Sequence, residues 1–206
     1  MAHSLRIFFL AVLAVLAGCV AVVPITEYTP TTTDGTLHTS NFLGAKSVRY
    51  VFDGVPVFVT LDRGRTEPLD LRIGLTLAEG QVARVPAPEI RISSLDQRSV
   101  EVRLLPDWER HALRFVKPRN KRLERVIVEI APAAGPLVGG VVDDGSDVVR
   151  RPATKTFSTS IPIRSLAASG YQIALPAIEI NGRLNSISPI EYRKQHRVEW
   201  MVPANC

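Results

Sequence analysis

The dominant pattern along the chain is an alternation of hydrophobic and polar residues with a period of two. It is clearest over residues 71–78, LRIGLTLA, and this spacing predicts a strand with one buried face. In VEVRL, residues 100–104, the same rule places the aliphatic side chains on the buried face and Glu101 and Arg103 opposite. Further strands are predicted over residues 47–52, 55–61, 82–92, 126–130, 156–163, 171–175, 177–181 and 198–202.

Turn-forming pairs separate these segments. They include Asp53-Gly54, Glu79-Gly80 and Asn181-Gly182, of which the last is the strongest hairpin signal. Because no helical pattern of 10 to 15 residues falls between the strands, we expect an all-β fold, an antiparallel β-sandwich of immunoglobulin-like type. Residues 107–116 favour a strand, with a helix capped by Asp107 as the alternative.

The first 18 residues have the layout of a secretory signal peptide. Arg6 precedes ten apolar residues, Ile7 to Leu16, and no acidic residue occurs in this segment. As a helix the apolar run would span about 15 Å, half of the roughly 30 Å that a hydrocarbon core requires. We therefore expect cleavage rather than a permanent membrane span.

The junction Leu16-Ala17-Gly18-Cys19 resembles the lipobox of bacterial lipoproteins. The resemblance implies cleavage before Cys19, acylation of that residue with fatty acids such as palmitate, and a membrane anchor. Val20 follows where Asp would favour the inner membrane, so the resemblance implies the outer membrane of a Gram-negative cell, facing the periplasm. The alternative is ordinary cleavage near Cys19 and Ala21, which would leave a soluble periplasmic protein.

The mature chain divides into a tether and one domain. Residues 19–44 are rich in Thr and Pro and predict a lipidated tether, with pairing of part of this segment as an edge strand as the alternative. Residues 45–206 form the expected β-sandwich domain. The segment 175–206 is similar to the ends of uncharacterised exported β-rich bacterial proteins, which implies a secreted β-domain and no activity.

The chain is basic, with 25 Lys and Arg against 20 Asp and Glu. For an exported protein this charge favours contact with lipopolysaccharide, peptidoglycan carboxylates or another envelope protein. The basic residues lack interleaved aromatic side chains, so we expect no binding of nucleic acid.

The sequence carries none of the common hydrolase, zinc-protease or nucleotide-binding motifs. We therefore expect no cofactor and no catalytic residues. The three histidines after the leader, His38, His111 and His196, are far apart in the sequence and predict surface positions. A catalytic triad that assembles only in space stays open.

Two charged segments are candidate binding sites. Asp143, Asp144 and Asp147 place three carboxylates beside Gly145, which makes them weak metal candidates against a solvated acidic turn. A predicted hairpin tip gathers five cations that could contact an anionic surface, against the alternative of a solubilising turn: Lys117, Arg119, Lys121, Arg122 and Arg125.

Cys206 ends the chain and is the only cysteine besides Cys19. Acylation of Cys19 would leave Cys206 without an internal partner, which predicts an intermolecular disulfide in an oxidising compartment. The alternative is a sulfur packed against the domain as a small hydrophobic group.

These features together predict an outer-membrane lipoprotein whose β-domain binds or scaffolds another envelope component without catalysis. The alternatives are an envelope hydrolase, or a chaperone or surface-appendage component with an exposed hydrophobic strand edge.

Overall fold

The structure is a computed structural model that describes residues 21–31, 34–39, 46–63, 69–97, 100–117, 122–140, 154–163 and 168–201. Its regular elements in these ranges are all strands, so the predicted all-β fold is confirmed. Neighbouring strands in the sheets pair in antiparallel orientation. The immunoglobulin-like connectivity stays a prediction.

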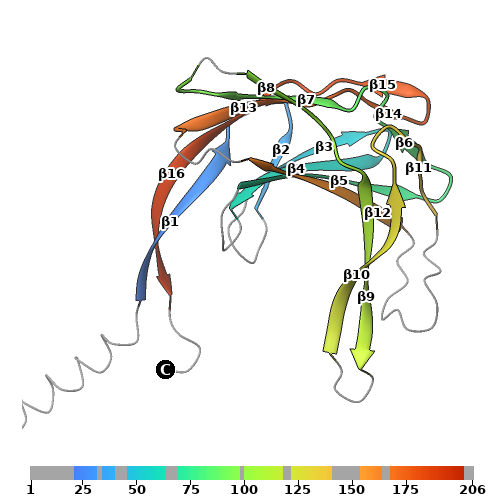
Figure 1. The fold of residues 1–206 in the computed structure, drawn as a ribbon, viewed down its shortest axis with the longest axis horizontal. Helices are drawn as coiled ribbons and strands as arrows, with labels where there is room; N and C mark the ends of the chain where they lie inside the picture. Colours follow the sequence, from blue (N-terminus) through green and yellow to red (C-terminus); the bar gives the residue numbers. More distant parts are fainter. Residues whose placement is uncertain are drawn as a thin grey trace, which may run out of the picture. The chain divides into compact units, whose positions relative to one another are not determined.

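The described strands form three sheets (Figure 1). The five-stranded sheet has the order β1 (Ala21–Pro30), β16 (Ile190–Met201), β13 (Gly170–Ala174), β7 (Glu89–Ser94) and β8 (Val100–Leu104). The seven-stranded sheet has the order β10 (Arg122–Ala131), β9 (Trp108–Lys117), β12 (Thr154–Ile163), β5 (Leu69–Ala78), β4 (Val55–Arg63), β3 (Lys46–Phe52) and β2 (Thr36–Thr39). The four-stranded sheet has the order β11 (Leu137–Val138), β6 (Val82–Arg84), β14 (Ile178–Ile180) and β15 (Arg183–Asn185).

The chain separates into two compact units. The described part of the smaller unit consists of residues 21–27 and 195–201, where Thr26 Oγ1 lies 3.0 Å from His196 Nδ1. The larger unit runs from Tyr28 to Lys194 and holds the hydrophobic core.

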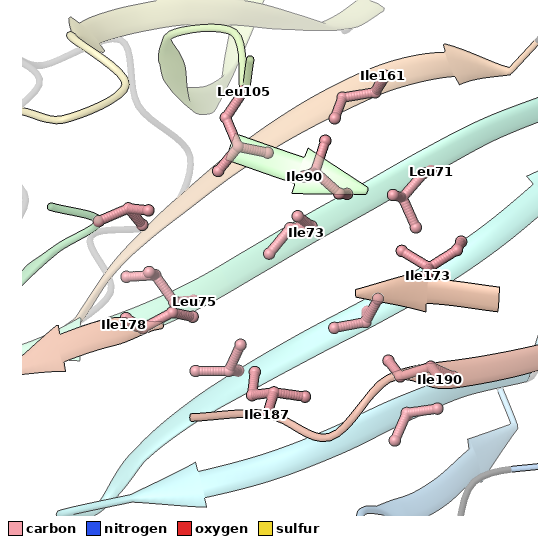
Figure 2. Packing of buried hydrophobic residues seen from close by; sticks show 14 of the residues in the cluster. Leu71, Ile73, Leu75, Ile90, Leu105, Ile161, Ile173, Ile178, Ile187 and Ile190 are labelled. Carbon is pink, nitrogen blue, oxygen red and sulfur yellow. The ribbon is translucent and has the colours of Figure 1, made fainter. Parts of the chain in front are cut away.

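The core of the larger unit lies between the inner faces of the five-stranded and seven-stranded sheets, as in a β-sandwich. Figure 2 shows Leu71, Ile73 and Leu75 of β5 packed near Ile90 and Ile173 of the other sheet. These side chains are at most 2% exposed, as the period-two pattern over residues 71–78 predicts. Burial of such aliphatic side chains contributes about 1.5 to 3 kcal/mol each and dominates the stability of the fold.

Much of the segment that was expected to form a tether, residues 19–44, lies in strands of the two large sheets. Residues 21–30 and 36–39 lie in β1 and β2, which are edge strands of the two large sheets. Tyr28 belongs to the core, is 4% exposed, and donates a hydrogen bond to the Ala168 carbonyl at 3.2 Å. The pairing that stood as the alternative is therefore what the structure shows, because Tyr and Thr side chains suit a half-buried strand.

Strand β8 exists as predicted, but its orientation contradicts the expected burial. Val100, Val102 and Leu104 are 60%, 53% and 72% exposed. Glu101 and Arg103 pair with the buried Ile92 and Ile90 of β7, so the charged residues share the inner side of the sheet. Arg103 also donates to the Pro162 carbonyl of β12. A period of two fixes which residues share a face but not which face is buried.

The segment at 107–116 is a strand, and the helical alternative is wrong. Strand β9 pairs with β10 along its whole length, from Ala131 opposite Trp108 to Arg122 opposite Lys117. Its pairing with β12 is confined to Glu109 and Arg110. The hairpin therefore continues past β12 as a two-stranded ribbon, drawn in green and yellow in Figure 1.

Candidate functional site

Small hydroxyl side chains gather on the outer face of the seven-stranded sheet. In β12, Phe157 and Ile161 face the core, whereas Thr156, Ser158 and Ser160 face outward. The ladder places Ser160 opposite Arg72 of β5 and Thr156 opposite Thr76, with the two threonine hydroxyls 3.0 Å apart. The alternation that buries the core strands thus lines their outer face with groups that can donate hydrogen bonds.

Strand β9 adds a carboxylate and an imidazole to this face. Glu109 lies opposite Ser158, and His111 follows two residues later on the same face of β9. The Glu109 Oε2 atom is 3.1 Å from His111 Nε2. His111 Nδ1 is buried and makes no hydrogen bond with any group in the described part of the chain.

These strands enclose a hollow of about 230 Å³. Its lining comes from β5, β9, β10 and β12: Arg72, Glu109, His111, Arg125, Ser158, Thr159 and Ser160. The Thr159 hydroxyl is turned away from a ligand because it donates to the Pro106 carbonyl at 3.1 Å. Ser158 and Ser160 supply the hydroxyls of the hollow that form no hydrogen bond with another described residue.

Two guanidinium groups dominate the charge of the hollow. Arg72 is half exposed and has one weak ion pair, with Asp70 at 3.7 Å. Arg125 is exposed. The carboxylate in the hollow, Glu109, is engaged with His111. Guanidinium groups beside hydroxyl donors match the geometry of a carboxylate or a phosphate.

A second charged cluster lies on the opposite side of β9 and has a structural role. Arg110 is 7% exposed, and its Nε lies 2.9 Å from Glu129 Oε2. Lys155 Nζ lies 3.3 Å from the same oxygen. This cluster joins β9, β10 and β12 at the point where β9 leaves the sheet, and so holds the hairpin that carries Arg125.

The predicted basic cluster is brought together only in part. Lys117 and Arg122 are paired at the end of the β9–β10 hairpin, while Arg119 and Lys121 lie outside the described residues. The side chain of Arg125 lines the hollow together with that of Arg72, which the sequence did not predict.

The other predicted sites fall outside the described residues. They are Cys19, the metal candidates Asp143, Asp144 and Asp147, and Cys206. Among the residues that the structure does describe, no group of three or more His, Cys, Asp or Glu side chains is arranged to hold a metal ion. The same residues include no helix long and apolar enough to cross a membrane.

Sequence reasoning missed Arg72, Glu109, Ser158 and Ser160 as site residues. Each is the outward member of an alternating strand, and strands that are distant in sequence bring them together. The available signal was the run Thr-Phe-Ser-Thr-Ser at residues 156–160, where every outward position carries a hydroxyl rather than a charge.

The fold and the hollow define a class, an all-β protein with a basic, hydroxyl-lined hollow on one sheet face. The chain matches no protein-family model, no curated protein and no solved structure.

Proposed function

We propose that this chain is an outer-membrane lipoprotein, anchored through Cys19 and facing the periplasm, whose β-domain binds an anionic envelope component without catalysis. The anchor rests on the lipobox at residues 16–19. The binding role rests on one observation, that Arg72 and Arg125 line the same hollow as Ser158 and Ser160.

The charges of the hollow favour an anion. Arg72 and Arg125 come from different strands, and two like charges lining one small hollow raise its electrostatic potential. Its carboxylate already faces an imidazole, so the guanidinium groups are the ones available to a ligand. An acidic group of peptidoglycan or a phosphate of lipopolysaccharide supplies the same chemistry, two or more oxygens that accept charge-assisted hydrogen bonds.

A titration of the intact lipoprotein in detergent tests this function with two soluble probes. One is a disaccharide-tetrapeptide fragment of peptidoglycan, which carries carboxylates. The other is a de-acylated lipid A headgroup, which carries phosphates. Heat released on binding one probe and not the other identifies the source of the anion.

The variants Arg72→Gln and Arg125→Gln are each expected to weaken that binding about tenfold or more, since a hydrogen bond to a charged group contributes about 1.5 to 3 kcal/mol. The matched control is Arg91→Gln. Arg91 is also an exposed arginine, on β7 of the other sheet and paired with Glu89, and its loss should leave binding unchanged. Equal binding by all four proteins, or binding of neither probe, would contradict the proposal.

An envelope hydrolase is the second candidate, because Glu109, His111 and two serines line one hollow. In a serine hydrolase the histidine nitrogen that does not face the carboxylate must reach the nucleophilic hydroxyl. Here that nitrogen is Nδ1, which is buried and makes no hydrogen bond with a described group. This supports binding over hydrolysis. Turnover of the peptidoglycan fragment that is lost in both Ser158→Ala and Ser160→Ala would reverse the preference.

A further inference from the structure

Strand β8 ends the five-stranded sheet and presents an edge with exposed aliphatic side chains. Its neighbour in the sheet order of the described strands is β7 alone. Three of its five side chains are exposed aliphatics, Val100, Val102 and Leu104. Exposed edges are normally blunted by Lys, Pro, a bulge, a very short strand or inward-pointing charges, because their free backbone groups pair readily with another strand. Of these devices β8 has the inward-pointing charges, Glu101 and Arg103, which neutralise each other at 2.6 Å.

The other edge strands of the described sheets carry one or more of these features. Strand β1, the other edge of the five-stranded sheet, contains Pro24 and Pro30. Strand β2 is a short polar strand, TLHT, and β11 and β15 have two and three residues. Strand β10 exposes Ile127 and Ile130 but carries four charged residues, Arg122, Glu124, Arg125 and Glu129. The outward face of β8 carries neither a charge nor a proline, so it stands apart as a docking edge.

The sequence of β8 is complementary to itself when two copies run antiparallel. Val-Glu-Val-Arg-Leu reads apolar, charged, apolar, oppositely charged, apolar in either direction. Within one copy Arg103 pairs with Glu101 at 2.6 Å. Pairing about a twofold axis at Val102 would place Glu101 of each copy opposite Arg103 of the other as well. The same register places Val100 opposite Leu104 and Val102 opposite Val102 on the outward face. Opposite charges and aliphatic pairs at facing positions both stabilise antiparallel strands.

We propose that β8 is a dimerisation edge, at which a second copy of this chain adds its own β8 in antiparallel register about Val102. The two five-stranded sheets then form one continuous sheet, and the contact is isologous, as a twofold dimer requires. This inference is independent of the ligand proposed for the hollow, because β8 and the hollow lie on different sheets.

Charge reversal tests the register in the intact lipoprotein, by sedimentation equilibrium in a density-matched detergent. Glu101→Arg places Arg opposite Arg103 at both ends of the contact and should weaken self-association about tenfold or more, because two attractive pairs become repulsive. Arg103→Glu has the same effect on pairing but also removes its bonds to the Pro162 carbonyl and to Glu101 of its own strand. The double variant Glu101→Arg/Arg103→Glu should restore association, with circular dichroism confirming that each variant is folded.

A second pair of variants distinguishes association through β8 from nonspecific association through exposed aliphatic side chains. Val102→Lys should abolish association, whereas Val138→Lys changes a similarly exposed valine on β11 of the four-stranded sheet and should leave it intact. A monomeric wild-type protein, single charge reversals without effect, or failure of the double variant to recover would each overturn the proposal.

A cross-link identifies the occupant directly. Residues facing each other across antiparallel strands have Cα atoms about 4.5 to 5.5 Å apart, within the range that a disulfide spans. Val102→Cys in a full chain that also carries Cys206→Ser should therefore form a disulfide-linked homodimer in the oxidised envelope. A mixed disulfide with a different protein, and no homodimer, would show that β8 receives a foreign strand and would overturn self-pairing.

Discussion

Tyr192 is a buried polar contact between the two large sheets. It is 0% exposed on β16, and its hydroxyl donates to the Val59 carbonyl of β4 at 3.4 Å. Burial is the main cause that raises the pKa of the Tyr192 phenol above its ordinary value of 10.0, with Tyr50 as a second cause. The folded protein therefore holds this proton more tightly than the unfolded chain does.

The raised pKa predicts a loss of stability in alkali. The contribution of the neutral phenol is fully present below the unfolded value of about 10, and is lost as the pH rises from there towards the folded value. Tyr192→Phe should cost about 1 kcal/mol of unfolding free energy at pH 7 through the lost hydrogen bond. The difference from wild type should narrow above about pH 10. Urea unfolding across this range measures it, and a constant difference would contradict the assignment.

The sequence predicted which side chains of a strand are buried where the hydrophobic residues of an alternating strand all lie on one face. The aliphatic side chains of residues 71–77 are buried as predicted, because that face of β5 lies in the core between the two large sheets. The orientation of β8 was not predictable, since Val-Glu-Val-Arg-Leu satisfies the same period with either face outward. Tyr28 was missed for a related reason. A Thr-rich segment resembles a tether in composition, and only its pairing in a sheet shows that it packs in the core.

At the scale of elements, the hairpin that joins β14 and β15 is the clearest agreement between sequence and structure. Asn181 and Gly182 have φ values of 51° and 82°, the left-handed conformation that a two-residue hairpin turn of type I′ requires. The Asn181 side chain also accepts a hydrogen bond from the Val82 backbone N–H at 3.0 Å, which ties the turn to β6. Asp53 and Gly54 form an equivalent turn between β3 and β4.

Gly182→Ala should lower the unfolding free energy by about 1 to 2 kcal/mol, because a Cβ atom is disfavoured in the left-handed region. Gly74→Ala is the matched control. Gly74 lies within β5, and a Cβ there would meet its nearest atom at an ordinary 3.6 Å. Its replacement should be neutral or slightly stabilising. Urea midpoints compare the two variants, and equal losses would remove turn conformation as the cause.

At the scale of the whole molecule, the proposed anchor could be inferred from the sequence alone, whereas the hollow could not. The four residues that resemble a lipobox are consecutive, so the resemblance needs no fold. The hollow combines residues from four strands that lie up to 88 positions apart, such as Arg72 and Ser160, and only the sheet order makes them neighbours. Of the predicted basic cluster, Arg125 alone has its side chain placed in that hollow.

The proposed anchor predicts that replacing the Cys19 sulfur by oxygen prevents both cleavage and acylation. Cys19→Ser should leave the precursor uncleaved by the lipoprotein signal peptidase and without incorporated palmitate, because an oxygen replaces the sulfur that is acylated. Cys206→Ser is the control and should keep both cleavage and label. Metabolic labelling with fractionation measures the outcome. A Cys19→Ser chain that matured and stayed with the outer membrane would show that the anchor is elsewhere.

The most direct test of the proposed binding role is hydrogen exchange of backbone amides in the mature protein, measured by mass spectrometry. The exchange is compared without ligand and with a saturating amount of the peptidoglycan fragment or the lipid A headgroup. The account predicts that one of the two slows exchange in the segments of β5, β9, β10 and β12 that hold Arg72, Glu109, Arg125 and Ser158, and leaves β7 and β8 unchanged. Slowing confined to other strands, or no slowing with either ligand, would contradict it.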